Sequence, residues 1–353
     1  MADLLVLKSF SGESAESPEF QYLLSHCLLE AREVFERVEL AIAGEGPVTE
    51  ERRFDAVLLL SSSNVLLCRR SLAAMRERLD AGAQEVRPYR LADADLAAPI
   101  YTLRGYELAE HSFLERGPAD TPQNSSRQPV TLLRSSSDGS EIAYAGLFHE
   151  FIDYYGEVRS DVLSFVPSHA REVLEVGCGR GVTGRLLQET LGCRVTGVEL
   201  NPVVAREAAR HLHRVVQGDI QELEIAGGYD AVLALEVVEH LVEVEGFLGR
   251  LRGLLAPGGR AILSIPNVGH YSVVEDLIAG RWDYLPIGLL CYTHYRFFTR
   301  RTLADWLRRS GIRNFEIVPQ RTELPERLRE LRGGFETDLE SLATKGFYVL
   351  IEN

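Results

Sequence analysis

The chain has 353 residues, of which 45% are hydrophobic and 25% charged, and its formal net charge at pH 7 is −14. This size and composition suit two compact domains and exclude a disordered or fibrous chain. The negative charge argues against a protein that binds duplex nucleic acid, because such proteins gain most of their affinity by neutralising phosphates with Lys and Arg.

The cysteines and the N-terminus indicate a reducing compartment. The chain has five scattered cysteines and no C-x-x-C pair, so no thiolate metal site is expected. The N-terminus, MADLLVLKSF, carries an acid where a secretory signal needs positive charge. No apolar stretch approaches the ~18 residues of a membrane span. We therefore expect a cytoplasmic protein without a membrane partner.

Residues 1–115 are expected to form a small α/β domain. Strand patterns at residues 4–8, 38–43 and 55–60 alternate with helical patterns around 19–36 and 70–81. This domain is followed by a linker over residues 116–140, RGPADTPQNSSRQPVTLLRSSSDGS, which is rich in Ser, Pro, Gly and Gln and has little periodic hydrophobicity. The second domain then covers residues 141–353, and it begins with a helical lead-in at 143–165.

Part of the first domain, RFDAVLLLSSSNVLLCRRSLAAMRERL at residues 53–79, resembles the core of nucleotide-sugar glycosyltransferases. In that family the strand ends in two acids that hold a metal and a diphosphate. The corresponding positions here are Ser62 to Asn64. Without carboxylates a divalent ion has too few hard oxygen ligands, so we expect a degenerate domain with a binding or oligomerisation role.

Residues 173–184, VLEVGCGRGVTG, predict a buried strand that runs into a glycine-rich turn and a helix. Gly177, Gly179 and Gly181 let the backbone turn tightly and touch a ligand, which side chains would block. The helix that follows offers unpaired N–H groups to an anion. The dinucleotide fingerprint G-x-G-x-x-G needs its third glycine one position later, where the chain has valine. With Glu175 ahead of it, the segment resembles motif I of the class I S-adenosylmethionine (SAM) methyltransferases.

The resemblance continues in register along the second domain. Glu199 ends the next strand, where an acid accepts hydrogen bonds from ribose hydroxyls, and Pro202 opens a helix as in the family. The alternative for Glu199 is a charge at a helix N-terminus. In the family, the segment equivalent to Gly218-Asp219-Ile220 places a carboxylate near the adenine amino group. The run LEVVEHL, followed by LRGLLAPGGRAILSIPN, also matches the family.

The resemblance implies an α/β fold, namely a Rossmann-like seven-stranded sheet with a smaller N-terminal α/β domain. Further strands are expected at residues 194–198, 213–217, 229–235, 260–265, 315–319 and 346–351, and helices at 244–255, 302–310 and 324–342. The lead-in would bring Tyr155 and Arg159, on one helix face at i and i+4, over the methionine carboxylate of SAM. The alternative for its aromatic residues is core packing.

The set of cofactor-binding residues that the resemblance implies comes from the glycine-rich turn, the strand ends and the lead-in. It comprises Glu175, Gly177, Cys178, Gly179, Gly181, Glu199, Leu200, Asp219, Ile220, Glu236, Tyr155 and Arg159.

Residues 267–299 are expected to form a substrate lid, because in open α/β sheets ligands bind outside the carboxyl ends of the strands. The pattern IPN..H…GRWDY…GLL..TH.RFFT resembles methyltransferase domains found with bacterial glycosyltransferases and in natural-product pathways. It departs from them at Cys291, where an aspartate is more familiar. The aromatic residues of this segment line the acceptor pocket or fasten the lid, and for Phe297 and Phe298 we favour the fastening role.

Three histidines are candidate general bases, since histidine titrates closest to neutral pH. His294, on the lid, is preferred to His240 and His270. The alternative for His240 is a structural hydrogen bond.

A divalent cation is a second choice for activating the acceptor. Glu236, Glu239 and His240 would share one helix face at i, i+3 and i+4, and His270 or His294 would complete the site. This resembles the E-x-x-E-H metal site of small-RNA terminal 2′-O-methyltransferases and of ubiquinone-pathway O-methyltransferases. Ordinary solvated capping charges are the competing explanation.

The sequence therefore predicts a SAM-dependent methyltransferase acting on a hydroxyl of a small polar acceptor, a sugar or a secondary metabolite. N-methylation, metal-dependent RNA 2′-O-methylation and a non-catalytic SAM-binding scaffold are the alternatives. A homodimer or a glycosyltransferase partner is left open.

Overall fold

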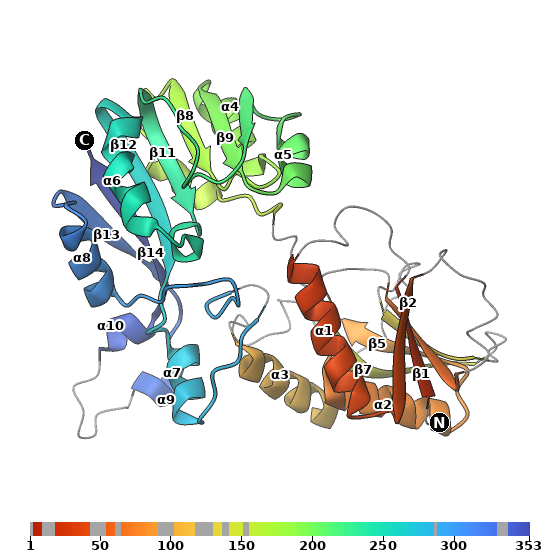
Figure 1. Cartoon of the computed structure of the whole chain (residues 1–353). Helices are drawn as coiled ribbons and strands as arrows, with labels where there is room; N and C mark the ends of the chain where they lie inside the picture. The colour runs from red at the N-terminus through yellow and green to blue at the C-terminus, as the bar shows by residue number, and fades with distance from the viewer. Residues whose placement is uncertain are drawn as a thin grey trace. The chain divides into compact units, whose positions relative to one another are not determined.

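The computed structural model divides into two compact units, Met1–Ile152 and Asp153–Asn353 (Figure 1). The residues that it describes are 3–8, 18–42, 54–60, 65–90, 102–116, 130–135, 141–150, 155–285, 288–329 and 338–353. In this part of the chain, no helix combines the length and the apolar composition needed to cross a membrane.

The N-terminal unit is built on one sheet with the strand order β2-β1-β3-β6-β5-β7-β4. Its elements are β1 (Asp3–Lys8), α1 (Pro18–Arg32), β2 (Arg37–Ile42), β3 (Ala56–Leu60), β4 (Val65–Leu66), α2 (Arg69–Asp80), β5 (Glu85–Arg90), α3 (Leu103–Arg116), β6 (Val130–Arg134) and β7 (Ile142–Glu150). Strand β1 lies between the parallel strands β2 and β3, and Leu72, Met75 and Leu79 of α2 pack in the same buried cluster as the strands. The elements predicted up to residue 81 are confirmed, apart from small shifts at their ends.

The predicted linker and lead-in helix are wrong where the structure describes them. Strand β6, inside the expected linker, pairs antiparallel with both β3 and β5, and β7 is a strand parallel to β5 where a helix was expected. The unit boundary therefore follows Ile152. Val130 and Leu132 alternate with less buried neighbours, a period-2 pattern too short to stand out beside the serine-rich flanks. Ser62 to Asn64 and most of the expected linker lie outside the described residues.

The C-terminal unit has the predicted seven-stranded sheet, in the order β10-β9-β8-β11-β12-β14-β13. Its strands are β8 (Glu172–Val176), β9 (Arg194–Glu199), β10 (Arg214–Gln217), β11 (Tyr229–Leu235), β12 (Leu255–Pro266), β13 (Phe315–Arg321) and β14 (Thr344–Glu352). The pairs from β10 to β12 are parallel, whereas β14 is antiparallel to both β12 and β13. The strand order reverses between β8 and β11, which is where ligands bind in open α/β sheets.

The helical elements of this unit are η4 (Ser160–Ser164), α4 (Val182–Leu191), α5 (Pro202–Ala208), η5 (Val238–His240), α6 (Val244–Leu254), α7 (Tyr271–Ile278), α8 (Arg300–Arg309), α9 (Glu326–Arg329) and α10 (Leu339–Leu342). Helix α7, inside the expected lid, was not predicted. The single helix expected at residues 324–342 is wrong, because Asp338 is not helical and caps the separate short helix α10. Residues 330–337 lie outside the described residues.

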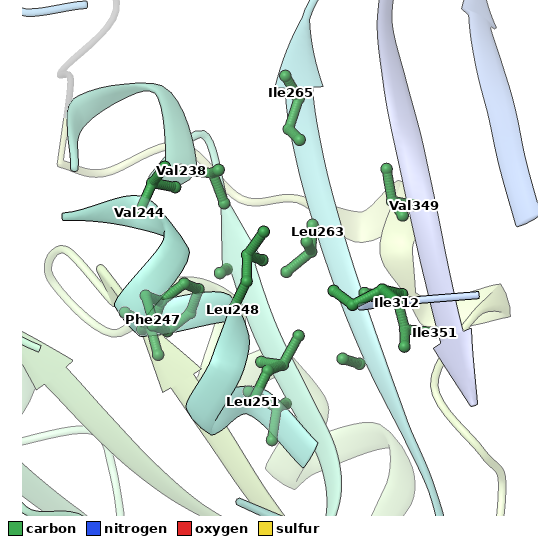
Figure 2. Packing of buried hydrophobic residues seen from close by; sticks show 14 of the residues in the cluster. Val238, Val244, Phe247, Leu248, Leu251, Leu263, Ile265, Ile312, Val349 and Ile351 are labelled. Carbon is green, nitrogen blue, oxygen red and sulfur yellow. The ribbon is translucent and has the colours of Figure 1, made fainter. Parts of the chain in front are cut away.

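The main core of this unit lies between α6 and the sheet. Figure 2 shows Leu248 and Leu251 directed from α6 toward Leu263 of β12, and Val244 beside Val238, and all of these residues and Phe247 belong to one buried cluster. The spacing of i, i+3, i+4 and i+7 among the four α6 residues places them on one helix face, so the amphipathic pattern of the sequence explains the packing. This core holds β11 and β12 together at the edge from which the site residues emerge.

Replacing Leu248 by Ala should lower the free energy of unfolding of the C-terminal unit by about 2–5 kcal/mol, because the removed atoms leave a cavity in a packed core. Both tryptophans of the chain, Trp282 and Trp306, lie in this unit, so their fluorescence during urea denaturation reports on it alone. Val242→Ala, at a side chain that is 53% exposed, is the control and should change little. Equal losses in the two variants would contradict the packing shown in Figure 2.

Candidate functional site

The glycine-rich turn between β8 and α4 has the conformation predicted for a ligand cradle. Gly177, Gly179 and Gly181 have φ values of +67°, +52° and +78°, a region that side-chain-bearing residues rarely adopt. A Cβ on Gly177 would lie 2.6 Å from Val237 Cγ2, and one on Gly179 would lie 2.5 Å from the Tyr155 carbonyl oxygen. Glycine is therefore required here both for the turn and for the close approach of neighbouring segments.

Glu199, at the end of β9, ties the cradle to the neighbouring strand. Its buried carboxylate accepts hydrogen bonds from the backbone N–H of Gly179 (3.0 Å) and from that of Asn201 (2.9 Å). Asn201 in turn caps α5, with Pro202 at its first position. A role of this carboxylate in binding ribose hydroxyls stays a prediction.

The other residues expected around the adenosine follow β9 and β10. Leu200 is 65% exposed and Ile220 is buried. Asp219 accepts hydrogen bonds from the backbone and side-chain amides of Gln221. Burial raises the pKa of the Cys178 thiol, so this residue stays neutral. Their roles in binding remain predictions.

Glu175 has an environment of its own. Its buried carboxyl faces the first turn of α4, where a Cβ on Gly184 would lie 2.5 Å from Glu175 Oε2. Burial, followed by the charge of Glu199, raises its pKa to about 8, and a hydrogen bond from the Gly184 N–H partly offsets the rise. This contact accounts for the acid as a support for α4, while a contact with the cofactor stays a prediction.

The expected helix face shared by Tyr155 and Arg159 is wrong, because residues 155–159 form a turn before η4. Tyr155 contributes its carbonyl oxygen, which accepts a hydrogen bond from the Arg180 N–H (2.9 Å). Arg159 donates to the Tyr348 hydroxyl (2.7 Å), and its Nη1 lies 3.8 Å from Glu236 Oε1. The structure thus brings Arg159 and Glu236 together at the carboxyl end of β11.

Glu236 is the only non-glycine residue with a positive φ, +53°, in the part of the chain that is described. Its backbone N–H is shared between the carbonyl oxygen (3.2 Å) and the Oγ (3.0 Å) of Ser264, and that hydroxyl donates to Glu236 Oε1 (2.6 Å). After Glu236 the chain makes only the short turn η5, so the predicted helical face of Glu236, Glu239 and His240 is wrong.

The tertiary structure nevertheless assembles a cluster of metal-ligating side chains, although not through a helix. Glu239, His240 and His294 have ligand atoms that all lie within 4.8 Å of one another. Glu239 is fully buried, and neither of its carboxyl oxygens has a hydrogen-bond partner among the described residues. Its pKa is raised well above the usual value, first by burial and then by the charge of Glu236. A cation would compensate this carboxylate.

The histidines of the cluster are both suited to donate a lone pair. His240 Nδ1 lies 3.2 Å from the Thr293 carbonyl oxygen and 3.0 Å from Thr293 Oγ1. A carbonyl oxygen only accepts, so Nδ1 carries the proton and the neutral ring has its lone pair on Nε2. Burial lowers the pKa of His240, and burial together with the charge of His240 lowers that of His294 to about 3. Both rings are therefore neutral at pH 7.

His270 has a structural role, so its prediction as a candidate general base or metal ligand is wrong. Its ring is buried and hydrogen-bonded to the hydroxyls of Ser272 (2.9 Å) and Thr322 (3.0 Å), and it caps α7. These contacts occupy both ring nitrogens. Burial lowers the pKa of His270 to about 4.

The last part of the lid contacts the segment that follows β11. The backbone N–H of Tyr295 donates to the Glu239 carbonyl oxygen (2.9 Å), which keeps the neighbouring His294 close to Glu239. The buried Phe298 packs on Trp306 of α8, in agreement with a fastening role, whereas Phe297 packs on Trp282 within the lid itself. Cys291 is buried, with its Sγ 3.1 Å from Thr293 Oγ1.

Sequence reasoning missed three supporting residues, namely Ser264, Thr293 and Tyr348. Each acts on a predicted site residue through a contact between distant parts of the chain. For Ser264 the sequence does contain a signal, a lone serine within the apolar run of β12.

Comparison with known proteins shows the family to which the chain belongs. A family model described as "Methyltransferase domain" matches residues 148–317. The ubiquinone biosynthesis O-methyltransferase of Xylella fastidiosa is 32% identical over 179 residues, covering 47% of this chain and 71% of the relative. Its namesake from Nitrosococcus oceani is 27% identical over 198 residues, covering 51% and 84%. A solved SAM-dependent methyltransferase from Archaeoglobus fulgidus is 21% identical and covers 55% of this chain and 92% of its own, with a TM-score of 0.41.

The chain therefore belongs to the class I SAM-dependent methyltransferases. It is a methyltransferase enzyme with SAM as its cofactor, as the sequence predicted.

Glu175 should make the stability of the C-terminal unit depend on pH. Its pKa is raised to about 8 in the folded state, so its contribution is fully present below the unfolded pKa near 4.5 and is lost as pH rises through 8. The loss is at most about 1.4 kcal/mol per pH unit. Urea denaturation at pH 6, 7 and 8 should therefore show Glu175→Gln becoming more stable relative to wild type as pH rises. A difference that stays constant across these pH values would contradict the assignment, and Glu316→Gln, on an exposed side chain, is the control.

Proposed function

We propose that this enzyme methylates a hydroxyl group of a small polar acceptor, a sugar or a secondary metabolite. The observation that carries the proposal is the cluster of Glu239, His240 and His294 at the end of β11, close to the glycine cradle. A hydroxyl acceptor has to lose its proton during transfer, and an amine acceptor needs less help of this kind. The O-methyltransferase relatives support the same choice of nucleophile.

The cofactor supplies an electrophilic methyl group on a sulfonium, and the chain must orient it. Glu199, at the end of β9, would accept hydrogen bonds from ribose hydroxyls. Arg159 and Glu236 present a cation and an anion 3.8 Å apart, which suits the carboxylate and ammonium groups of an amino acid. Alignment of acceptor and methyl group can contribute ~7–11 kcal/mol, whereas a general base typically contributes about 10²–10⁴-fold in rate. Positioning by these residues should therefore dominate catalysis.

His294 alone is a poor general base, so we propose a role as a metal ligand in place of the general base expected from the sequence. With its pKa lowered to about 3, it would take a hydroxyl proton only weakly at pH 7. The same burial favours a neutral imidazole beside a buried carboxylate, as in protein metal sites. We therefore propose that Glu239, His240 and His294 hold a divalent cation, with Glu236 close by. A bound cation would lower the pKa of an acceptor hydroxyl.

Isothermal titration calorimetry should show that wild-type protein binds S-adenosylhomocysteine and that Glu199→Ala binds at least about tenfold more weakly, because charged acceptors for the ribose are lost. Glu316→Ala, at an exposed acid on β13, is the matched control and should bind as wild type does. Folded wild-type protein, free of copurified ligand, that gives no heat at two temperatures would contradict the cofactor site. With binding established, sugars, phenols and amines are the acceptors to compare.

Mn²⁺ should bind to the wild-type protein, and Glu239→Gln and His294→Ala should each weaken binding at least about tenfold, since each removes a ligand. Binding can be measured by electron paramagnetic resonance of free Mn²⁺, with Mg²⁺ and Zn²⁺ as competitors. His213→Ala removes an exposed histidine and should have no effect. Binding that survives both cluster variants, or full methyl transfer in the presence of a chelator, would contradict the metal site.

A further inference from the structure

A buried hydroxyl next to the site, that of Ser264, has no role in the mechanism so far. Ser264 lies on β12, is fully buried, and is opposite Leu235 of β11 and Tyr348 of β14. Its neighbours along the strand are buried and mostly apolar. A polar group in such a place costs free energy unless its hydrogen bonds are satisfied, so its contacts indicate what it does.

Within the described part of the chain, the Ser264 side chain forms its hydrogen bonds with Glu236. The hydroxyl oxygen accepts from the Glu236 N–H at 3.0 Å, and the hydroxyl proton goes to Glu236 Oε1 at 2.6 Å. One side chain therefore holds both the backbone and the carboxylate of the same residue. Glu236 is also the residue with φ of +53°, a conformation that costs free energy for any side-chain-bearing residue. Strain of this kind persists only where neighbouring contacts maintain it.

The strained conformation has a defined consequence for the site. It places Glu236 Oε1 3.8 Å from Arg159 Nη1, and Arg159 is itself hydrogen-bonded to Tyr348 on the strand next to Ser264. The carboxylate of Glu236 and the guanidinium of Arg159 are thus held by hydrogen bonds from two adjacent strands, β12 and β14. An alanine at position 264 would leave the Glu236 N–H only the carbonyl oxygen, at 3.2 Å, and would leave the carboxylate without this donor.

We propose that Ser264 is a positioning residue for cofactor binding. It keeps Glu236 in the left-handed conformation in which its carboxylate meets the ammonium group of the cofactor, while Arg159 meets the carboxylate. This inference rests on the proposed use of Arg159 and Glu236 by the amino-acid part of SAM.

Two ligands that differ only in that part test the proposal. S-adenosylhomocysteine carries the amino acid, whereas 5′-methylthioadenosine lacks it. Ser264→Ala should weaken S-adenosylhomocysteine about tenfold, as expected for a lost hydrogen bond to a charged group, and should leave 5′-methylthioadenosine within twofold of wild type. Ser264→Cys replaces the hydroxyl by a larger thiol that is a much weaker donor, and it should lose S-adenosylhomocysteine affinity as Ser264→Ala does. Ser310→Ala, which removes a buried hydroxyl without a hydrogen-bond partner, is the control.

The double variant with Glu236→Ala separates positioning from a general structural effect. If Ser264 acts through Glu236, Ser264→Ala should cause no further loss of S-adenosylhomocysteine affinity in that background. Equal loss for both ligands, or the same loss with and without Glu236, would overturn the proposal.

A readout without any ligand keeps the inference separate from the proposed function. Ser264→Ala should lower the melting temperature of the C-terminal unit by about 2–4 °C. The effect should shrink in a Glu236→Gly background, where glycine adopts the positive φ without strain. If wild type binds neither ligand, the cofactor site fails, and this coupling still decides whether Ser264 holds Glu236. Equal shifts in both backgrounds would refute the inference.

Discussion

The site depends on one constraint of the sheet, the reversal of strand order between β8 and β11. The parallel strands β8 and β11 are neighbours at this reversal. In such a sheet the chain segments that follow the two strands lead away on opposite faces of the sheet, so a space stays open at the carboxyl ends of the strands. The segments that border this space approach one another closely, with Val237 against Gly177 and Tyr155 against Gly179. The three glycines follow from that approach, and the acids at the ends of β9 and β11 are placed by it.

Burial of the ionisable groups that follow β11 decides between a general base and a divalent cation as the means of activating an acceptor hydroxyl. An isolated imidazole whose pKa is near 3 is neutral but weakly basic, and an isolated buried carboxyl such as Glu239 takes up a proton. Neither group acts well alone at neutral pH. Together with His240 they bring ligand atoms within 4.8 Å of one another, an arrangement that a cation would stabilise. The hydrogen bond from His240 Nδ1 to the Thr293 carbonyl oxygen is the contact that presets such a ring.

The features that sequence reasoning predicted well are local in the chain. Three such features are the G-x-G-x-G turn, the strand ends at Glu199 and Asp219 and the apolar face of α6. Each arises from residues that are close together in the sequence. The errors occurred where partners are distant. Strand β6 is only five residues long and is recognised by its pairing with β3 and β5. Likewise, Glu239 and His294 are 55 positions apart, and only the path of the lid brings them together.

Departures from ordinary local rules gather at the same place as the site. A glutamate in a left-handed conformation, a serine in an apolar strand and a carboxyl without a hydrogen-bond partner all occur at the ends of β11 and β12. Each would lower stability if it stood alone. The large apolar core between α6 and the sheet lies directly beside them and can offset this cost. A fold that carries strain and buried charge on the inner strands of its sheet can hold reacting groups in fixed positions before the ligands arrive. Ser264 couples that rigid core to the strained carboxylate, which is why a residue with no contact to the acceptor belongs to the description of the site.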